Sequence, residues 1–355
     1  MTDELRWGIL GCGRIASDFA RAMRNCQNNN RVVAVAASNL ERADEFVENL
    51  HLDSVKTYGN YEELLMDPFV DIVYVALLNM DHCKWTIRAL EANKHVLCEK
   101  PFAVNANQAR MMIEMAKRKG KFLMEAVWTW FFPVWRDIRK IIASEEMGAV
   151  RLVNANLGVE FHSTRLGLEK AETPLMAAGF YTVALALMAF NYEFPKKVQI
   201  CGDKDENGVD KWGSITLDFG QGRHACLYYG GFCWSATSAS VTFDKGQIQV
   251  PRFFWCPDNY IKIDGLLRAG RTQEKAISYP LSGDPQLYNN NNSAGMCYEI
   301  DHVYEQIKAG RVESDIVPLD KTVQVAELMD LLRSQIDLKF PQDLEEKFHF
   351  FSTNV

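Results

Sequence analysis

Apolar runs and amphipathic stretches alternate along the first 126 residues of the chain. The short, continuous apolar runs predict strands over residues 5–10, 31–37, 70–77, 95–98 and 122–126. The stretches between them have apolar residues at helical spacing and predict helices over residues 15–25, 41–50, 81–92 and 105–119. Continuous apolar strands linked by helices are typical of a parallel sheet that helices bury on both faces. The pattern therefore predicts an α/β domain with a doubly wound parallel sheet.

The pattern changes beyond about residue 150, where shorter segments follow each other closely and are separated by Gly or Asp turns. These segments predict strands over residues 151–161, 196–202, 214–219, 224–231, 235–243 and 248–250. Amphipathic stretches predict helices over residues 175–190, 294–309 and 319–336, and the tract from Asn289 to Asn292 predicts a solvated turn. We expect an α+β second domain with a large, mostly antiparallel open sheet. The two domains are expected over residues 1–127 and 128–355.

Composition is that of an ordinary globular protein: of the 355 residues, 48% are hydrophobic and 24% are charged. The formal net charge of -7 gives no electrostatic support to a nucleic-acid surface. No apolar run reaches the length of about 18 residues that a membrane span requires. The acidic start, MTDELRWGIL, leads directly into a strand and differs from a signal peptide.

Cysteine and histidine usage points to a reducing compartment without a metal site. The nine cysteines include no C-x-x-C pair, and their odd number argues against a closed set of disulfides. The seven histidines have no metal-ligand spacing beside them. We therefore expect reduced thiols, a cytoplasmic location and no bound metal.

The letters GILGCGRIA place Gly11-x-Gly13-x-x-Ala16 between the first predicted strand and the first predicted helix. Gly11 permits a tight turn, Gly13 lets a pyrophosphate approach the backbone, and the small Ala16 lets the helix pack on its strand. An anion can then bind at the helix N-terminus, where N–H groups are free and the dipole is favourable. Arg14 and Ile15 belong to the same segment, and we expect all five residues to bind the cofactor. The first domain is thus predicted to be a dinucleotide-binding Rossmann domain.

The end of the second predicted strand bears on the choice of dinucleotide. An acid that would bind a ribose 2′-hydroxyl is missing there, and Ser38 and Asn39 occupy its place. Arg42 follows one turn later, and neutral hydrogen-bonding side chains with a nearby Arg suit a 2′-phosphate. Glu41 points the other way, although the first turn of a helix is also a common place for an acid. We expect NADP, with NAD as the less favoured alternative.

Several longer motifs occur in order along nearly the whole chain: RWGILGCGRIA, VLCEKPFAVN, FLMEAVWTWFFP, NSAGMCYEIDHV and FPQD. Together with the placement of Glu99-Lys100-Pro101 directly after the apolar run 95–98, they make the chain resemble the glucose–fructose oxidoreductase/inositol dehydrogenase (Gfo/Idh/MocA) superfamily. It looks closest to the dimeric dihydrodiol dehydrogenase branch, whose members oxidise trans-dihydrodiols of aromatic hydrocarbons and also D-xylose. Long motifs in the correct order are more specific than any one of them alone.

The resemblance implies hydride transfer from a vicinal diol or a cyclic sugar CH–OH to the nicotinamide of NADP. The lysine of the superfamily's Glu-Lys-Pro motif falls on Lys100, which would orient the hydroxyl and stabilise alkoxide character. Partial burial would lower the pKa of this lysine towards a useful value. Glu99 and Pro101 would aim the lysine, with Glu99 beside the cofactor. Tyr181 matches the superfamily's aromatic position and is the expected proton donor or acceptor.

Three positions depart from the superfamily's pattern. Ala177 stands where the helix that carries Tyr181 often presents an Asp. The branch's His-x-x-His becomes Asn79-x-x-His82, and we expect both residues to contact the cofactor, with a helix cap as the alternative role for His82. In the branch's W-T-R-F-F-P motif, Trp130 replaces the Arg.

An aromatic cluster and one loop are candidates for the substrate pocket. Trp128 and Phe131 would form a wall for an apolar ring, although aromatic clusters belong more often to a core or an interface. His162 and Arg165 lie in the loop before the helix over residues 175–190 and are candidates to replace the missing acid. The aromatic segments 227–229 and 253–255 fit either a core or a dimer face, and the resemblance implies a homodimer through the second sheet.

Two other functions stay open. Loss of the acid at Ala177 would suit a non-catalytic NADP-binding sensor or scaffold, and a related sugar dehydrogenase with another substrate is the other alternative. The presence of Lys100 and Tyr181 favours an active dehydrogenase. The physiological diol or sugar is left open, because loops that sequence patterns do not position shape the pocket.

Overall fold

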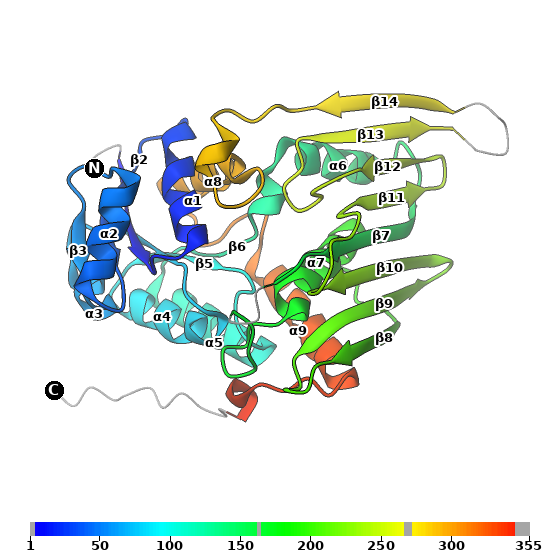
Figure 1. Ribbon diagram of the computed structural model, residues 1–355. Helices are drawn as coiled ribbons and strands as arrows, with labels where there is room; N and C mark the ends of the chain where they lie inside the picture. Colours follow the sequence, from blue (N-terminus) through cyan, green and yellow to red (C-terminus); the bar gives the residue numbers. More distant parts are fainter. Residues whose placement is uncertain (1–3, 162–164, 266–271, 345–355) are drawn as a thin grey trace.

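Two β-sheets of different type organise the chain (Figure 1). The computed structural model describes residues 4–161, 165–265 and 272–344. Within these ranges, one sheet has six strands and the other has eight. The predicted combination of a doubly wound parallel sheet with a mostly antiparallel open sheet is therefore confirmed. Every helix in the described ranges is too short or too polar to cross a membrane.

The first sheet is parallel and is buried on both faces. Its strands are β1 (Leu5–Leu10), β2 (Asn30–Ala36), β3 (Lys56–Tyr58), β4 (Ile72–Val75), β5 (His95–Glu99) and β6 (Leu123–Ala126). The helices between them are α1 (Arg14–Ala22), α2 (Leu40–Leu50), α3 (Tyr61–Met66), α4 (Asn79–Glu91) and α5 (Ala106–Lys119). The strand order β3-β2-β1-β4-β5-β6 reverses between β1 and β4. In such sheets, ligands bind beyond the carboxyl ends of the strands at the point of reversal.

Two hydrophobic clusters cover the two faces of this sheet. One contains buried residues of α1 and the other contains buried residues of α4 and α5. The sequence pattern missed β3, a three-residue edge strand that is half exposed, and the short α3 beside it. Neither is long enough to develop a clear apolar period, which explains why they were missed.

The second sheet is mostly antiparallel. Its strands are β7 (Val150–Gly158), β8 (Lys197–Lys204), β9 (Asp210–Gly220), β10 (Arg223–Gly230), β11 (Ala239–Phe243), β12 (Gly246–Val250), β13 (Asn259–Asp264) and β14 (Gln273–Ser278). They lie in the order β14-β13-β12-β11-β7-β10-β9-β8, and β7 and β10 form a parallel pair. β13 and β14 were not predicted, because β14 is an almost entirely exposed edge strand and β13 beside it has only one fully buried residue.

Helices cover one face of the second sheet (Figure 1). The helices of this half are α6 (Pro133–Ser144), α7 (Phe180–Ala189), α8 (Met296–Lys308) and α9 (Leu319–Gln335). α7 is buried along its whole length and packs on β7 and β10. A π-helical turn over Leu175–Gly179 precedes it, so the helix predicted over residues 175–190 is present with a wider first turn. α6, which begins at Pro133, was not predicted.

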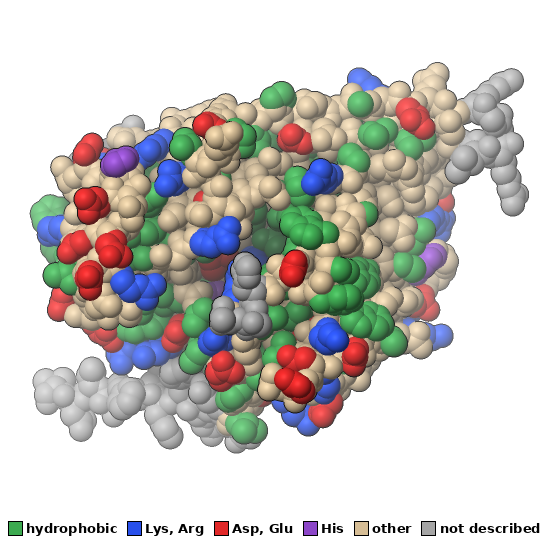
Figure 2. All heavy atoms as spheres, in the orientation of Figure 1, with side chains coloured by type: hydrophobic (Ala, Val, Ile, Leu, Met, Phe, Trp, Pro, Cys, Tyr) green, Lys and Arg blue, Asp and Glu red, His purple; other side chains and the backbone are tan. Residues whose placement is uncertain are grey.

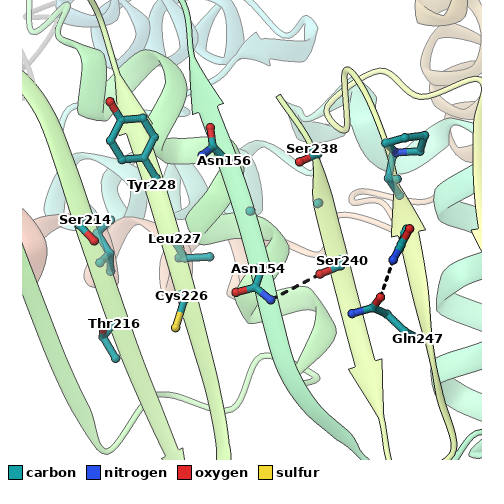
Figure 3. Close-up of a pocket in the computed structure, with 16 residues that line it drawn as sticks. Asn154, Asn156, Ser214, Thr216, Cys226, Leu227, Tyr228, Ser238, Ser240 and Gln247 are labelled. Atoms are coloured by element: carbon teal, nitrogen blue, oxygen red, sulfur yellow. Dashed lines mark hydrogen bonds between the residues drawn. The ribbon is translucent and has the colours of Figure 1, made fainter. Parts of the chain in front are cut away.

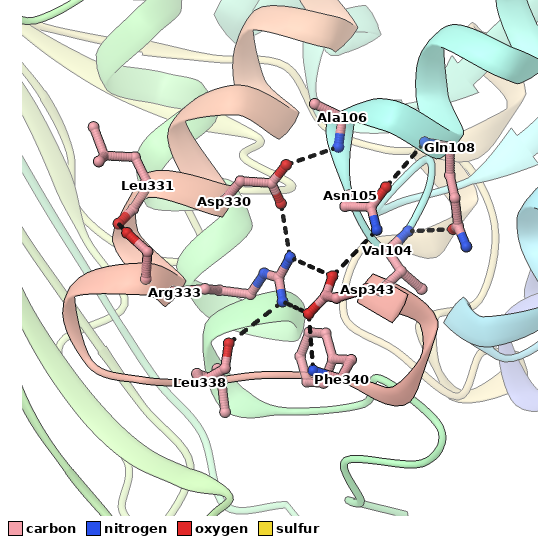
Figure 4. Close-up of polar contacts among 11 residues, drawn as sticks. Val104, Asn105, Ala106, Gln108, Asp330, Leu331, Arg333, Leu338, Phe340 and Asp343 are labelled. Carbon is pink, nitrogen blue, oxygen red and sulfur yellow. Dashed lines mark hydrogen bonds and ion pairs between the residues drawn. The ribbon is translucent and has the colours of Figure 1, made fainter. Parts of the chain in front are cut away.

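The last two helices return to the first sheet, where α8 packs against α1 and α9 packs against α5. At the end of α9, the buried guanidinium of Arg333 bonds Asp330 and Asp343, each at 2.8 Å (Figure 4). Asp343 also accepts a hydrogen bond from the Asn105 side chain at 3.1 Å, and Asp330 accepts one from the Ala106 amide at 2.9 Å. Arg333 thus links α9 and the segment after it to the first turn of α5.

The asparagine tract from Asn289 to Asn292 forms bends and a turn that are mostly exposed, as the sequence predicted. The tract also bonds a distant acid, because Asn289 and Asn290 donate hydrogen bonds to Asp18 on α1. The pattern of polar residues could not reveal this, because the partner lies about 270 residues away in the sequence.

We predict that Arg333→Ala lowers the free energy of unfolding by about 3 kcal/mol, because it leaves two carboxylates without their shared cation. Arg110→Ala is the matched control: Arg110 pairs with Glu327 between the same two helices, α5 and α9, but at the surface. The control should change stability by less than about 0.5 kcal/mol. Urea unfolding of the three proteins measures both values, and equal losses would contradict the role of Arg333.

Candidate active site

The turn between β1 and α1 forms an open cradle at a helix N-terminus. Gly11 has a φ of +99°, and a Cβ atom added there would lie 2.4 Å from the carbonyl oxygen of Ala76. A Cβ added at Gly13 would meet no atom within 4 Å, so the space above the helix start is open. Ala16 is fully buried where α1 packs on the sheet. Gly13 is the N-cap of α1 and has no side chain that could cap the helix. The N–H groups of the first turn, which include those of Arg14 and Ile15, are therefore free.

These features fit the pyrophosphate of a dinucleotide, since they combine free backbone donors, a helix dipole and room for an anion. Beside the cradle, past the end of β2, Arg42 Nη1 donates to Ser38 Oγ at 3.2 Å, and all three of Ser38, Asn39 and Arg42 are exposed. The Asn39 side chain caps α2 by accepting from the Arg42 amide at 2.9 Å. The Ser38 hydroxyl and the Arg42 guanidinium therefore lie together at the position predicted to bind a 2′-phosphate.

Lys100 follows the last residue of β5 and reaches the second half of the molecule. Its Nζ donates to the carbonyl oxygen of Ala177 at 3.3 Å and lies 4.8 Å from the centroid of the Tyr181 ring. Burial lowers the pKa of Lys100, while the charge of Glu99 acts in the opposite direction. The two predicted catalytic residues are thus brought together, and the residue that replaces the expected Asp contributes its backbone carbonyl.

Glu99 is held from two sides. Its Oε1 accepts from the Tyr74 hydroxyl at 2.5 Å, and its Oε2 accepts from the Lys100 amide at 3.2 Å. Burial raises the pKa of this carboxyl, against the lowering effect of the Lys100 charge. Tyr74 lies on β4, the neighbour of β5, so the two adjacent strands fix the carboxylate beside Lys100.

Tyr181, in the first turn of α7, is oriented by Trp128. Its hydroxyl oxygen accepts a hydrogen bond from Trp128 Nε1 at 2.9 Å. Burial raises the pKa of Tyr181 well above its usual value, and the Trp128 bond acts in the opposite direction. The hydroxyl hydrogen is then available to donate to another acceptor.

Glu172 is an acid near this site that the sequence analysis did not single out. Its side chain is 7% exposed, and it accepts from the Asn79 amide at the start of α4 at 3.3 Å. The Asn79 side chain in turn donates to the carbonyl oxygen of Ala171 at 2.7 Å. The charge of Glu172 helps to keep the pKa of Lys100 from falling further. The acid is visible in the sequence Ala-Glu-Thr-Pro over residues 171–174, but nothing in that segment relates it to Lys100.

Two residues predicted to replace the missing acid have different outcomes. Arg165 is 59% exposed and its Nε lies 3.8 Å from a carboxylate oxygen of Glu172, so it pairs with the acid that is present. His162 lies outside the described residues.

His82 is fully buried and faces two carbonyl oxygens. Its Nδ1 lies 2.8 Å from Pro101 O and its Nε2 lies 3.2 Å from Leu77 O. Burial lowers the pKa of His82 to about 4, so the ring is neutral at pH 7. The N-cap of α4 is Leu78 without a side-chain cap bond, so the alternative of a helix cap is wrong. A neutral imidazole has one N–H, so His82 donates to one of these two carbonyl oxygens, either in the turn after Lys100 or just before α4.

The two aromatic candidates, Trp128 and Phe131, are both buried and contact different neighbours. Trp128 contacts Tyr181, whereas the ring of Phe131 packs 4.8 Å from His302 on α8. Trp255 lies 6.5 Å from the Tyr181 ring, in a turn rather than in a strand of the sheet. The prediction missed this placement because Trp255 reaches the site through tertiary contacts. Figure 2 shows the molecule hollowed between its two halves on this face, with hydrophobic side chains gathered on the side of the second sheet.

Two further carboxyl groups are buried near Glu99. Glu125, on β6, accepts from the Phe102 amide at 2.9 Å and from the Thr322 hydroxyl at 3.0 Å. Burial raises the pKa of Glu125 to about 7. Burial also raises the pKa of Glu299, on α8, well above its usual value, and its carboxyl has no hydrogen-bond partner among the described residues. Within the same ranges no group of three or more His, Cys, Asp or Glu residues could hold a metal ion.

Comparison with known families matches both halves of the chain. Residues 5–127 match the family described as "Oxidoreductase family, NAD-binding Rossmann fold", and residues 135–249 match "GFO/IDH/MocA C-terminal domain". Curated relatives named trans-1,2-dihydrobenzene-1,2-diol dehydrogenase, from Homo sapiens and Sus scrofa, are 35% and 36% identical to the chain. Each comparison covers 96% of this chain and 99% of the relative. The chain therefore belongs to the Gfo/Idh/MocA family of oxidoreductases.

Solved structures share the fold at lower identity. A 3-ketoreductase from Actinomadura kijaniata, in complex with NADP and TDP-benzene, has a TM-score of 0.78 and 21% identity. An aldose-aldose oxidoreductase from Caulobacter crescentus, complexed with glycerol, has a TM-score of 0.78 and 22% identity. Each covers 94% of this chain and 98% of its own. At these identities the likeness establishes the fold alone.

We predict that Glu125 makes stability depend on pH. Its pKa is about 7 in the folded protein and near the ordinary 4.5 in the unfolded chain, so the unfolded chain loses this proton first as the pH rises. Folding stability therefore falls between about pH 4.5 and pH 7, and this group has no further effect above that range. Glu125→Gln removes the effect and keeps an acceptor for the Phe102 amide. Urea unfolding should show the variant gaining roughly 2 to 3 kcal/mol relative to the wild type between pH 5 and pH 8. A difference that does not change with pH would contradict this prediction.

Proposed function

We propose that the protein is an NADP-dependent dehydrogenase that oxidises a secondary alcohol in a vicinal diol or a cyclic sugar. The observation that carries the proposal is the position of Lys100: its ammonium group lies against Tyr181 and the carbonyl of Ala177, directly beyond the carboxyl end of β5. A buried lysine with a lowered pKa beside a tyrosine hydroxyl is suited to move a hydroxyl proton.

The cofactor would be held by this chain's residues at three points. Gly11, Gly13 and the first-turn amides of α1 bind the pyrophosphate, and Ser38 with Arg42 binds the 2′-phosphate. Lys100 lies at the nicotinamide end. When bound, NADP supplies the hydride acceptor at nicotinamide C4. We propose a positioning role for His82 in place of the cofactor contact expected from the sequence, and the contact expected from Asn79 remains a proposal.

Lys100 and Tyr181 then share the proton chemistry. The substrate hydroxyl binds between Lys100 Nζ and the Tyr181 hydroxyl. Its proton leaves to Lys100 in the neutral amine form, which burial favours by lowering the pKa of the lysine, as the carbon gives up its hydride. The oxygen keeps the electron pair of the broken O–H bond and becomes the carbonyl oxygen of the product. Glu99 and Ala177 O hold the lysine in place during this step. Glu172 supplies the nearby negative charge that the missing Asp would have provided.

Two observations support the proposed substrate class: the aromatic residues near Lys100 and the names of the related proteins. The Tyr181 ring lies against the lysine, and Trp128 and Trp255 lie beside Tyr181, so the aromatic surface suits one apolar face of a ring. The relatives at 35% and 36% identity carry the name of a dihydrodiol dehydrogenase, which supports a trans-dihydrodiol over other alcohols. D-Xylose and related aldoses are the second candidates, because a cyclic sugar also presents adjacent hydroxyls on one ring.

We also propose that the protein is a cytoplasmic homodimer that pairs through the second sheet, with the domain boundary between residues 127 and 128. The uncovered face of this sheet is hollowed by about 620 Å³ and is lined by polar side chains such as Asn154, Ser214 and Gln247 (Figure 3). A concave face of donors and acceptors supports pairing with a second copy. Among the described residues the nine cysteines form no disulfide bond, which supports a reducing compartment.

We predict that Lys100→Met abolishes turnover, at least about 10³-fold in kcat/KM, while NADPH affinity changes by less than about 3-fold, because the change removes the proton acceptor but leaves the pyrophosphate cradle. NADPH formation should be followed with a panel of trans-dihydrodiols and aldoses. Lys84→Met is the matched control, since Lys84 is exposed on α4 and lies over Trp85.

Two outcomes would overturn the proposed reaction. The first is cofactor binding without turnover of any member of the panel, which would favour a sensor or scaffold. The second is an equal activity for Lys100→Met and the wild type.

We predict that Arg42→Ala weakens NADP binding about 10- to 100-fold and changes NAD binding by less than about 3-fold, because the guanidinium would bond only the 2′-phosphate. Arg88→Ala, a surface change on α4, is the control. Fluorescence titration with both cofactors measures the affinities. Equal weakening of NADP and NAD by Arg42→Ala would contradict the preference for NADP.

A further inference from the structure

Asp18 is a buried acid on α1 whose hydrogen bonds all come from the asparagine tract and the serine that follows it. Its Oδ1 accepts from the amide and the side chain of Asn289 at 2.7 and 2.9 Å. Its Oδ2 accepts from the amide and the side chain of Asn290 at 2.9 and 2.8 Å, and from the Ser293 hydroxyl at 2.9 Å. Asp18 is fully buried, although Asn289 and Asn290 lie at the surface. Five donors on one carboxylate fill its capacity to accept, so the tract is fixed on α1 at this point.

The same tract also meets the first residue of α1. Arg14 Nη2 donates to the carbonyl oxygen of Asn289 at 2.9 Å, and the Asn289 side chain donates back to the carbonyl oxygen of Arg14 at 3.2 Å. Arg14 follows Gly13, the N-cap that faces the open cradle. Arg14 and Asp18 are four residues apart and therefore lie on one face of the helix. The tract thus lies along α1 from its first residue, next to the pyrophosphate cradle.

The far end of the tract has a separate anchor. The Asn292 side chain donates to the carbonyl oxygen of Cys256 at 2.7 Å, next to Trp255. Ser293 then begins the turn that leads into α8. If Asp18 is lost, Asn289, Asn290 and Ser293 lose their acceptor, while Asn292 still holds the far end of the tract through Cys256 O. The end beside Arg14 then has no side-chain acceptor on α1.

We propose that Asp18 is a positioning residue for the dinucleotide: it holds the asparagine tract against Arg14, so that the tract forms the second wall of the pyrophosphate site. This inference rests on the dinucleotide part of the proposed function. The guanidinium of Arg14, held by the carbonyl oxygen of Asn289, would then face phosphate oxygens from the side of the tract. Two segments that are about 275 residues apart in the sequence build one anion site.

Asp301 offers a matched control at the other end of α1. Its carboxylate accepts from the amides of Gln27 and Asn28 at 2.8 and 2.9 Å. This contact joins α8 to the loop after α1, so it links the same parts of the molecule through the same chemistry. It lies away from the glycine turn, and loss of Asp301 should leave the cradle intact.

The experiment compares NADPH binding to the full-length wild type, Asp18→Asn and Asp301→Asn by titration calorimetry. Asp18→Asn places an amide donor against the donors of the tract and releases it from Arg14. We expect the Kd for NADPH to rise at least about 10-fold for Asp18→Asn and less than about 2-fold for Asp301→Asn. The kcat of Asp18→Asn at saturating cofactor should stay within about 2-fold of wild type, because Lys100 and Tyr181 are untouched.

The outcomes separate this inference from the proposed function. If the wild type does not bind NADPH, the dinucleotide part of the proposed function fails. If the wild type binds but Asp18→Asn binds equally well or more tightly, the inference alone is overturned; tighter binding is the result expected if Asp18 acted only as a charge that repels phosphate. Equal weakening of NADPH binding by Asp18→Asn and Asp301→Asn would mean that both contacts only stabilise the fold, and this result would also overturn the inference.

A second variant tests the inference without touching the buried acid. Asn289→Ala removes the side-chain donors to Asp18 and to Arg14 O at an exposed position. We expect it to raise the Kd for NADPH about 3-fold or more with little change in the melting temperature. An unchanged Kd would overturn the inference even if Asp18→Asn does not fold.

Discussion

The candidate site depends on one ammonium group, that of Lys100, which is partly withdrawn from water where the two halves of the molecule meet. Removing Lys100 from water is unfavourable, and the protein offsets this with the neighbouring Glu99, a carbonyl from the π-turn and the face of an aromatic ring. Neighbouring residues hold these groups in turn: Tyr74 donates a hydrogen bond to Glu99, and His82 contacts the carbonyl oxygen of Pro101. Lys100 is held by residues of both halves of the molecule and is suited to proton transfer, because its position is fixed and its pKa is lowered.

The second half of the molecule completes the site rather than simply covering it. α7 supplies Tyr181, the segment before it supplies Glu172, and the turn at Trp255 supplies aromatic surface. The amides at the start of α4 bind this segment through Glu172 and the carbonyl of Lys170. The acid that the superfamily pattern places at position 177 is therefore not simply lost, since Glu172 puts a carboxylate near the lysine from another direction. The asparagine tract is a second case in which a segment distant in the sequence lies beside a candidate binding site, here the glycine turn before α1.

The sequence predicted the features that local chemistry determines. Buried strands have continuous apolar runs, and a glycine turn before a helix has few other uses, so the first sheet and its cradle could be recognised. Features determined by distant contacts could not. Glu172 and Trp255 look ordinary in their own segments, and Asn289 looks like part of a solvated loop until Asp18 is seen beside it. The edge strands β3 and β14 were missed for a different reason, because short or exposed strands do not need an apolar period.

The most direct test of this account is a crystal structure of the protein with NADPH bound. The account predicts that the pyrophosphate lies over Gly13, between the first turn of α1 and the asparagine tract. It also predicts that the nicotinamide lies beside Lys100 and Tyr181, with space for a substrate carbon about 3.5 Å from C4. A nicotinamide bound away from these two residues, or a Lys100 side chain directed away from the ring, would contradict the central claim that this buried lysine serves the hydride-transfer site.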